Sequence, residues 1–202
     1  IEHNQHTIAR FSSYIERKLC KKPIGLQDHY STALGGLRVF HYGESVKNTL
    51  LDPRDEFLPA LKDHLLLLYT GVSRDSSSIL EEQVAHPQID SLIQACDLVD
   101  HAVKFVYARN VTAFSELLNS GWEIKKKFAP KVTNDSLDKI YNKAMNKGAY
   151  GGKLLGAGGG GFFLFSAKPY FHQDITEATG LRSIPFDFVF PDGGVEVAFK
   201  SH

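Results

Sequence analysis

The fold of this chain is decided by the stretch Lys153-Leu154-Leu155-Gly156-Ala157-Gly158-Gly159-Gly160-Gly161-Phe162, which continues into Phe163-Leu164-Phe165. A glycine-dense turn thus stands between two apolar segments, and apolar runs bounded by turn residues are typical of buried strands. We therefore predict a strand, a turn and a second strand within residues 151–165. Glycine inside regular structure costs about 0.5–1 kcal/mol relative to alanine, so this density of glycine needs a reason.

The glycine turn has two interpretations. Successive backbone N–H groups can form an anion-binding concavity, and the turn would then line a cleft that handles phosphate. A flexible hairpin turn is the alternative, and it is the more frequent case for an arbitrary glycine-rich run. The sequence excludes the two commonest nucleotide motifs, because neither a Walker-type Gly-Lys-Ser/Thr nor a Rossmann helix follows the glycines.

The rest of the chain predicts helices and strands without regular alternation. Ile8, Phe11, Ile15 and Leu19 recur at steps of three and four, which predicts a helix with a packed apolar face. Strands are predicted at Leu37–Tyr42 and His64–Thr70, joined by a Pro-containing loop. Further helices are predicted within 26–36, 89–108, 111–128, 136–147 and 170–179, and edge strands at 187–190 and 194–199. This mixture indicates an α+β fold.

The composition is that of an ordinary globular chain without charge bias. Lys plus Arg and Asp plus Glu both number 23 in 202 residues, so no net field attracts nucleic acid or an anionic membrane. The longest apolar run, Leu65–Tyr69, is far below the roughly 20 residues that span a bilayer. Cys20 and Cys96 lack a metal-ligand spacing and are too few for a disulfide scaffold. We expect free thiols, no metal ligands, and a cytoplasmic protein with no nucleic-acid or membrane partner.

Asp28 is the candidate base. It lies in Gly25-Leu26-Gln27-Asp28-His29-Tyr30, shortly before Leu34-Gly35-Gly36. A carboxylate within reach of a hydroxyl can orient it and accept its proton as a phosphoryl group transfers. The alternative for Asp28 is an ordinary helix N-cap. His29 is chemically a more tempting base, but as the next residue on a helix it would point elsewhere.

A second candidate segment is Thr70-Gly71-Val72-Ser73-Arg74-Asp75, where one arginine stands among hydroxyls directly after a predicted strand. A guanidinium binds phosphate bidentately while hydroxyls fill the remaining acceptors. An exposed capping loop, with Arg74 paired to Asp75 or Glu81, is equally compatible with these residues. The run Lys125-Lys126-Lys127 is more often a solvated helix face, although one lysine could reach a cleft.

These segments resemble the GHMP kinases, the superfamily of galactokinase, homoserine kinase, mevalonate kinase and phosphomevalonate kinase. Lys153–Phe162 is similar to their third signature motif, and Gly25–Tyr30 is similar to the segment whose aspartate faces the acceptor hydroxyl. Leu66–Arg74 resembles the Tyr-Thr-Gly-x-Ser-Arg stretch of D-glycero-D-manno-heptose 7-phosphate kinases. The resemblance implies a ferredoxin-like GHMP C-terminal domain at 61–202, preceded at 1–60 by the end of the N-terminal kinase domain, which carries Asp28.

The function implied by this resemblance is ATP- and Mg²⁺-dependent phosphorylation of the anomeric hydroxyl of heptose 7-phosphate, giving heptose 1,7-bisphosphate for cell-surface glycan synthesis. Its small-molecule partners would be ATP and the sugar phosphate, and a homodimer is compatible with it. The implied roles are catalysis by Asp28, substrate binding by Gln27, Thr70, Ser73 and Arg74, and support of the ATP site by Gly156, Gly158, Gly159 and Gly160.

Other functions stay open. A kinase for another sugar such as galactose or fucose, a catalytically silent sugar or nucleotide sensor, and a plain interaction domain are compatible with the same fold. The family's Pro-x-x-x-Gly-Leu-Gly-Ser-Ser-Ala-type phosphate loop is absent from these residues. That loop supplies the helix N-terminus that holds the ATP phosphates, so we expect the active enzyme to be a longer polypeptide.

Overall fold

The computed structural model describes residues 4–51, 57–72, 77–185 and 193–196. The chain divides into two units, one formed by residues 1–52 with 189–202 and the other by residues 53–188. Each unit has a hydrophobic cluster of its own, and each is described by itself below.

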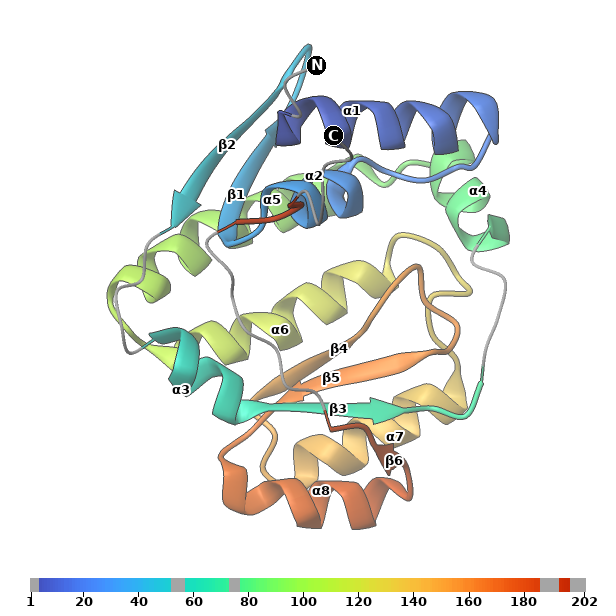
Figure 1. Ribbon diagram of the computed structural model, residues 1–202. Helices are drawn as coiled ribbons and strands as arrows, with labels where there is room; N and C mark the ends of the chain where they lie inside the picture. Colours follow the sequence, from blue (N-terminus) through green and yellow to red (C-terminus); the bar gives the residue numbers. More distant parts are fainter. Residues whose placement is uncertain (1–3, 52–56, 73–76, 186–192, 197–202) are drawn as a thin grey trace, which may run out of the picture. The chain divides into compact units, whose positions relative to one another are not determined.

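The described part of the first unit contains helices and a β-hairpin (Figure 1). Its elements are α1 (Gln5–Tyr14), a π-helical segment (Ile15–Leu19), α2 (Gln27–Leu34), β1 (Leu37–Tyr42) and β2 (Val46–Leu51). The Asn4 side chain caps α1 by accepting from His6 N at 2.9 Å, as expected for an N-cap asparagine. The strands pair antiparallel, with Leu37 opposite Leu51. The small core contains Ala9, Tyr30, Ala33 and Leu34.

The apolar face predicted for the first helix is not the face that packs. Ala9 and Ser13 are the buried residues of α1, whereas Phe11 is 58% exposed and Leu19 is 63% exposed. Small residues face α2 because the two helices lie close together. The spacing of apolar residues at steps of three and four therefore predicted the helix correctly, but the side of the helix that it predicted to be buried is wrong.

The second unit is built on a four-stranded antiparallel sheet. Its strands are β3 (Leu65–Tyr69), β4 (Gly151–Leu154), β5 (Phe162–Ser166) and β6 (Arg182–Ser183), in the order β4-β5-β3-β6. Leu67 pairs with Leu164, which in turn pairs with Lys153. Helices separate β3 from β4 and β5 from β6, so the unit has the strand-helix-strand-strand-helix-strand arrangement of ferredoxin-like folds.

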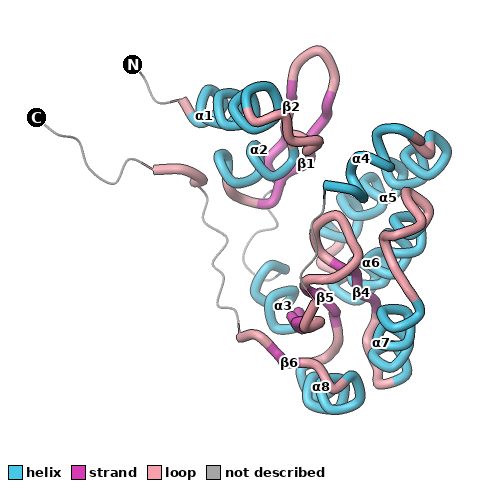
Figure 2. Tube along the Cα trace, turned by 90° about the vertical axis from the view of Figure 1, so that its right-hand side faces the viewer, coloured by secondary structure: helices cyan, strands magenta, loops and turns pink. Residues whose placement is uncertain are grey.

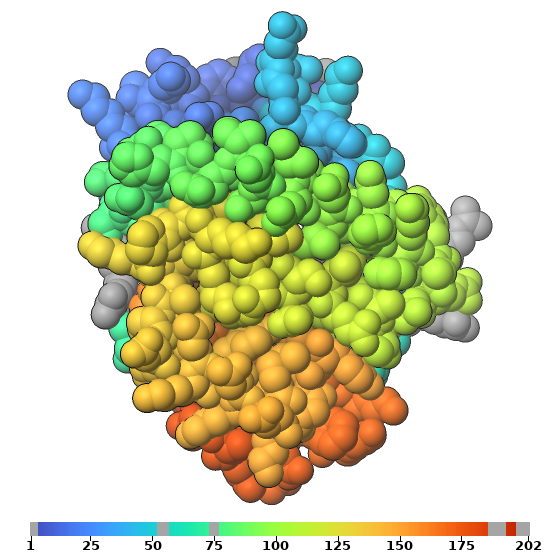
Figure 3. Space-filling view, turned by 180° about the vertical axis from the view of Figure 1, so that it is seen from behind, coloured from blue at the N-terminus to red at the C-terminus, as the bar shows by residue number. Residues whose placement is uncertain are grey.

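The helices of this unit are α3 (Phe57–His64), α4 (Ser77–Ala85), α5 (Ile89–Tyr107), α6 (Val111–Lys126), α7 (Asp135–Asn146) and α8 (His172–Thr179), the last preceded by a 3₁₀ turn (Pro169–Phe171). Figure 2 shows α6 and α7 on one side of β4 and β5. Seen from behind, the face of the molecule includes atoms of α4 and α5 in green, of α6 in yellow-green to yellow and of α7 in yellow-orange (Figure 3).

The core lies between the sheet and these helices because side chains alternate along each strand. Leu66, Leu68, Phe163 and Phe165 are buried on one face and join a cluster that includes Trp122 of α6, Tyr141 of α7 and Ile175 of α8. The Trp122 ring meets Phe163 edge-on at 6.0 Å. Leu67 and Leu164, on the other face, are only half-buried.

The α+β expectation is confirmed, and so are both strands around the glycine turn. The Pro-containing loop predicted between residues 42 and 64 is wrong, because β2 and α3 form there. Residues 187–190 and 197–199, part of the predicted edge strands, lie outside the described residues, and 194–196 are not a strand. The unpredicted β6 has two residues, too few for a periodicity signal.

The division between the units also differs from the expected position at residue 60. Helix α3 belongs to the second unit, since Phe57 meets Phe114 of α6 edge-on at 5.4 Å. Residues 189–202, expected in the 61–202 domain, group with the first unit, where Val195 N donates to Ala33 O at 3.0 Å. The assignment of the units to particular kinase domains stays a prediction.

Candidate functional site

The glycine turn between β4 and β5 is fixed by hydrogen bonds from outside the hairpin. Gly159 N donates to Val132 O, in the loop between α6 and α7, at 2.9 Å, and Gly161 N donates to Val72 O, after β3, at 2.8 Å. Thr70 donates to Gly161 O through its backbone N and through Oγ1, at 2.9 Å each. The turn is therefore a junction of three chain segments rather than a free hairpin loop.

Close approach explains why glycines are needed here. Gly158 has φ of +120°, and a Cβ atom there would lie 2.7 Å from Val132 O. Gly160 is equally tight, because a Cβ atom at that position would lie 2.7 Å from Val72 O. The amides of Gly159 and Gly161 serve these internal bonds, so an anion at the turn would have to use the other amides.

A cavity of about 380 Å³ adjoins the turn at Gly159, within the size range of roughly 300–1,000 Å³ common for small-ligand sites. Asn134 caps α7 at its edge by accepting from Ser136 N at 3.0 Å and Leu137 N at 3.1 Å. Among the described residues of its lining, Lys131 is the cationic side chain. These described lining residues are Thr70, Val72, Pro130, Lys131, Thr133, Asn134, Ser136, Leu137, Ile140 and Gly159. Hydroxyls and a lysine suit a polar ligand with negative charge.

The three consecutive lysines at the end of α6, of which Lys127 is the C-cap, have three different environments. Lys125 Nζ donates to Leu154 O at 2.7 Å and to Gly156 O at 2.5 Å, at the entrance of the turn. Lys126 pairs with Glu123 at 2.7 Å. Lys127, which is exposed, donates to Gln94 Oε1 at 3.4 Å. The interpretation as a solvated face holds best for Lys127, and Lys125 is the lysine that reaches the turn.

Burial, together with a smaller effect of the positive charge of Lys153, lowers the pKa of Lys125 from its ordinary value to about 8. Lys153, in the middle of β4, also has a lowered pKa because it is buried. Desolvation disfavours the charged form of each amine, and the like charge adds to this effect at Lys125. The entrance of the turn is thus a concentration of positive charge.

Asp28 and Gln27 lie in the first turn of α2 and are both exposed. The N-cap of this helix is Leu26, which makes no side-chain capping bond, so the alternative of Asp28 as an N-cap is wrong. Within the described part of the chain, no hydrogen bond or ion pair engages the Asp28 carboxylate. Burial raises the pKa of Tyr42, and the negative charge of Asp28 adds to the rise.

His29 points away from Asp28, as predicted. Its Nε2 lies 2.7 Å from Glu16 Oε2 on the π-helical segment, and its side chain is 8% exposed. Its Nδ1 is buried and has no hydrogen-bond partner among the described residues. The contact between His29 and Glu16 therefore connects α2 with the π-helical segment Ile15–Leu19 that follows α1.

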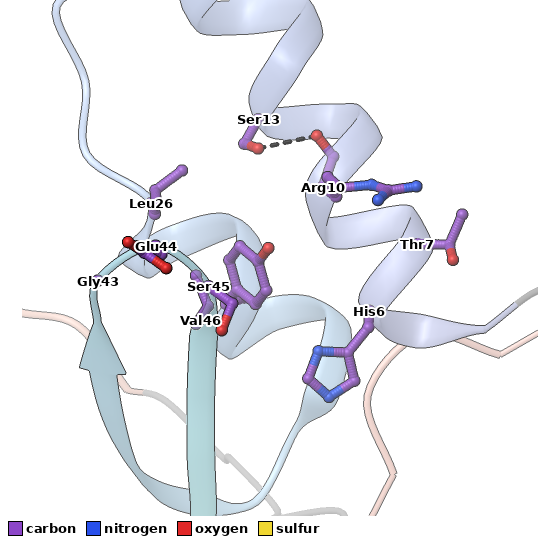
Figure 4. Close-up of a pocket in the computed structure, with 10 residues that line it drawn as sticks. His6, Thr7, Arg10, Ser13, Leu26, Gly43, Glu44, Ser45 and Val46 are labelled. Atoms are coloured by element: carbon purple, nitrogen blue, oxygen red, sulfur yellow. Dashed lines mark hydrogen bonds between the residues drawn. The ribbon is translucent and has the colours of Figure 1, made fainter.

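A second cavity, of about 460 Å³, lies in the first unit between α1, the start of α2 and the hairpin turn. Figure 4 shows Arg10 on α1 and Glu44 at the hairpin turn among its lining residues. Tyr30 also lines it, and two residues along a helix turn the direction by about 200°, so this cavity lies away from Asp28. With both charge signs present, it has no preference for an anion.

The predicted site residues are divided between the two units of the chain. Thr70 and the turn glycines meet in the second unit, whereas Asp28 and Gln27 belong to the first. Ser73 and Arg74 lie outside the described residues.

Cys20 and Cys96 are free cysteines, in agreement with the expectation of free thiols, and both are exposed. In residues 4–51, 57–72, 77–185 and 193–196, no three His, Cys, Asp or Glu side chains gather in a way that could hold a metal ion. Over the same described ranges, no helix combines the length and apolar character needed to cross a bilayer.

Residues 102–172, from α5 through the glycine turn to the start of α8, match the family model of the GHMP kinase C-terminal region. These residues are similar to the C-terminal domain of GHMP kinases. The match spans α6, the loop with Val132 and the turn itself, so the matched region contains the described contacts that fix the turn, except those of Thr70 and Val72.

The relatives described next, to which this chain is similar, are sugar kinases. A D-glycero-alpha-D-manno-heptose 7-phosphate kinase of Campylobacter jejuni is 26% identical over 200 residues, covering 95% of this chain and 59% of the relative. An L-fucokinase/L-fucose-1-P guanylyltransferase of Bacteroides fragilis is 27% identical over 154 residues, covering 71% of this chain and 16% of the relative. The chain thus spans less than two thirds of these relatives.

A crystal structure of a candidate sugar kinase from Campylobacter jejuni superposes with a TM-score of 0.68 at 25% identity, covering 97% of this chain and 58% of that one. The superposition extends over both units of the present chain. The α+β architecture is therefore that of GHMP kinases, as the resemblance implied.

Sequence reasoning missed the residues that fix the turn from outside. Val132 and Val72 act through backbone carbonyls, so no side-chain pattern marks them. Lys131 and Thr133 line the cavity. The sequence signal near them is the pair Asn134-Asp135, which is typical of the start of a helix and predicts that a helix begins after this loop. Lys125 belongs to the run of three lysines that the sequence analysis singled out. Lys126 and Lys127 belong to the same run, so the run alone does not show which lysine reaches the turn.

Proposed function

We propose that this chain is part of an ATP-dependent kinase that phosphorylates the anomeric hydroxyl of D-glycero-D-manno-heptose 7-phosphate, giving heptose 1,7-bisphosphate. The observation that carries the proposal is the similarity to a heptose 7-phosphate kinase along 95% of the chain. The glycine turn and the accessible Asp28 carboxylate support it, because phosphoryl transfer depends mainly on positioning and charge stabilisation. The product would be an intermediate for cell-surface glycans, made in the cytoplasm.

Asp28 is the proposed base. Its carboxylate is exposed on the first turn of α2 and is not engaged by any described partner, so it can accept a hydrogen bond from a sugar hydroxyl. In that role it orients the hydroxyl and takes its proton as the new P–O bond forms. Gln27, beside it, is the proposed hydrogen-bonding partner of a neighbouring sugar hydroxyl, since an amide both donates and accepts.

The distal phosphate of the sugar is assigned to Ser73 and Arg74, because a guanidinium fork matches two phosphate oxygens. Thr70, which precedes them, already donates its hydroxyl proton to Gly161 O at 2.9 Å. Toward a substrate it would therefore act as an acceptor, for a sugar hydroxyl and not for phosphate.

GHMP kinases use ATP with Mg²⁺. The residues of this chain fit an ATP phosphate only in part. Lys125 and Lys153 give the turn positive charge, but the Gly159 and Gly161 amides already donate to carbonyls of the chain. Gly156, Gly158, Gly159 and Gly160 are accordingly proposed to support the nucleotide site by shape. When bound, Mg²⁺ would neutralise charge on the transferring phosphates.

A fucose-type kinase is the second candidate, favoured by the similarity to the Bacteroides fragilis fucokinase. The two candidates differ in whether the acceptor already carries a phosphate. The test is ADP release by the complete protein with heptose 7-phosphate, unphosphorylated heptose, L-fucose and galactose. Release with heptose 7-phosphate alone supports the first proposal, release with fucose supports the second, and release with none of them contradicts both.

A further inference from the structure

The two ends of the glycine turn are fixed in different ways. The downstream half is held by backbone bonds, from Gly159 to Val132 and from Gly161 to Val72. The upstream end has open space around Gly156, where an added Cβ would meet nothing within 4 Å. There, the described contact that reaches the chain from another element is the Lys125 ammonium on Gly156 O.

Strand geometry explains why a side chain is needed at this point. Leu155 N donates to Phe162 O at 2.8 Å, so residue 155 directs its polar groups toward β5. By the alternation of strands, the Leu154 carbonyl points away from β5, and no other strand of the described residues pairs with β4 on that side. A buried carbonyl left without a donor costs free energy. Lys125 Nζ supplies the donor at 2.7 Å.

One ammonium thus joins two successive outward carbonyls, of Leu154 and Gly156, at the point where β4 passes into the turn. Charged donors make shorter and stronger hydrogen bonds than neutral ones. The charged group that faces Lys125 from β4 is Lys153, and on its own helix Glu123 is engaged with Lys126. No acidic side chain of the described residues pairs with Lys125, so the carbonyls are its counterpart.

We propose that Lys125 is a positioning residue that holds the entrance of the glycine turn in its observed conformation. If the chain acts in the kinase proposed above, the same contact sets where the turn lies beside the transferring phosphates. The first statement concerns the turn alone, and only the second rests on the proposed function.

The turn is tested by hydrogen exchange of residues 155–162 in the complete protein, measured by mass spectrometry on Lys125→Met. Losing the side-chain donor should speed exchange in this segment by about tenfold or more, since local opening controls exchange, while β3 stays protected. Lys126→Met and Lys127→Met are the matched controls, with the same chemical change one and two residues away, and should leave the turn unchanged. Unchanged exchange in a folded Lys125→Met protein overturns the proposal.

A pH series separates positioning from general destabilisation. Opening the turn would return Lys125 to water and to its ordinary pKa, so above the lowered pKa of about 8 the closed turn binds fewer protons than the open one. After correction for intrinsic exchange, protection of the turn in the natural protein should therefore rise as pH rises past about 8. The neutral amine still donates to the carbonyls and no longer bears the cost of a buried charge.

Two variants assign this pH dependence to its source. Lys125→Arg stays charged throughout the range and should lack the rise in protection. Lys153→Met removes the repelling neighbour, which raises the Lys125 pKa, and should move the rise to higher pH. A rise that is identical in all three proteins contradicts the assignment to Lys125, and this holds even if Lys125→Met does not fold.

Kinetics then test the second statement. In the complete kinase, Lys125→Met should lower kcat with little change in KM for the sugar, because the turn and not the sugar site is displaced. Changed exchange with unchanged kcat would remove the link to catalysis and leave the positioning role intact. Absence of phosphoryl transfer in the natural protein contradicts the proposed function without touching the exchange result.

Discussion

Gly158→Ala should destabilise the second unit by roughly 2–4 kcal/mol. An alanine at φ of +120° is strained, and residues forced into sparsely populated backbone regions cost about 1–3 kcal/mol each. Its Cβ would lie 2.7 Å from Val132 O, so the loop must move and the bond from Gly159 N to that carbonyl is weakened, at about 1 kcal/mol.

Gly156→Ala is the matched control, because Gly156 has φ of +67° but open space around it. In Gly156→Ala, only the strain of a left-handed backbone lowers the free energy of unfolding, by about 1–2 kcal/mol. Urea unfolding followed by the fluorescence of Trp122 measures both, since this buried residue is the single tryptophan of the chain and lies in the second unit. If Gly158→Ala costs no more than Gly156→Ala, close approach to Val132 is not the reason for the glycine.

Three further outcomes are expected. Asp28→Asn in the complete enzyme should lower kcat by about 10²-fold or more while leaving the Kd of ATP nearly unchanged, since the amide cannot accept the proton; a normal kcat removes Asp28 from the mechanism. Arg74→Ala should raise KM for a sugar phosphate by about tenfold, the equivalent of a lost charged hydrogen bond, without affecting an unphosphorylated sugar, and equal effects on both would refute the phosphate assignment. The pKa of Lys125 is lowered to about 8 in the folded protein. Between this value and the ordinary pKa of lysine, the unfolded chain therefore binds more protons than the folded protein does. The free energy of unfolding should rise with pH across this interval by roughly 3 kcal/mol. In Lys125→Met this rise should be absent from urea unfolding curves measured between about pH 7 and 10.5, and an unaltered pH slope would show that Lys125 is not the titrating group.

Local patterns predicted the parts of the fold whose cause is local. The strands around the glycine turn and the long helices α5, α6 and α7 were predicted near their observed bounds, because apolar periodicity and capping residues mark them directly. Helix α3 was missed because Pro59 suggests a loop, although proline is tolerated in the first turn of a helix. Strand β2 was missed because Lys47 and Asn48 break its apolar pattern.

The candidate site was predictable only as a set of residue types. The sequence shows that the density of glycines in the turn needs a reason. The reason is close contact with Val132 and Val72, and contacts between residues far apart in the chain cannot be predicted from the spacing of residues in the sequence. Likewise Lys125 could not be told from Lys126, since their different partners depend on the helix direction relative to β4. The burial of Ala9 instead of Phe11 shows the same limit, because which face packs depends on the neighbouring helix.

The central claim is that the complete protein phosphorylates heptose 7-phosphate at its anomeric carbon, and ³¹P NMR of the reaction with ATP and Mg²⁺ tests it most directly. The account predicts consumption of the γ-phosphate signal and a new phosphate signal coupled to the anomeric proton, with the phosphate already on the sugar retained. An unchanged sugar phosphate beside intact ATP, or a new phosphate formed only on an unphosphorylated sugar, would contradict it.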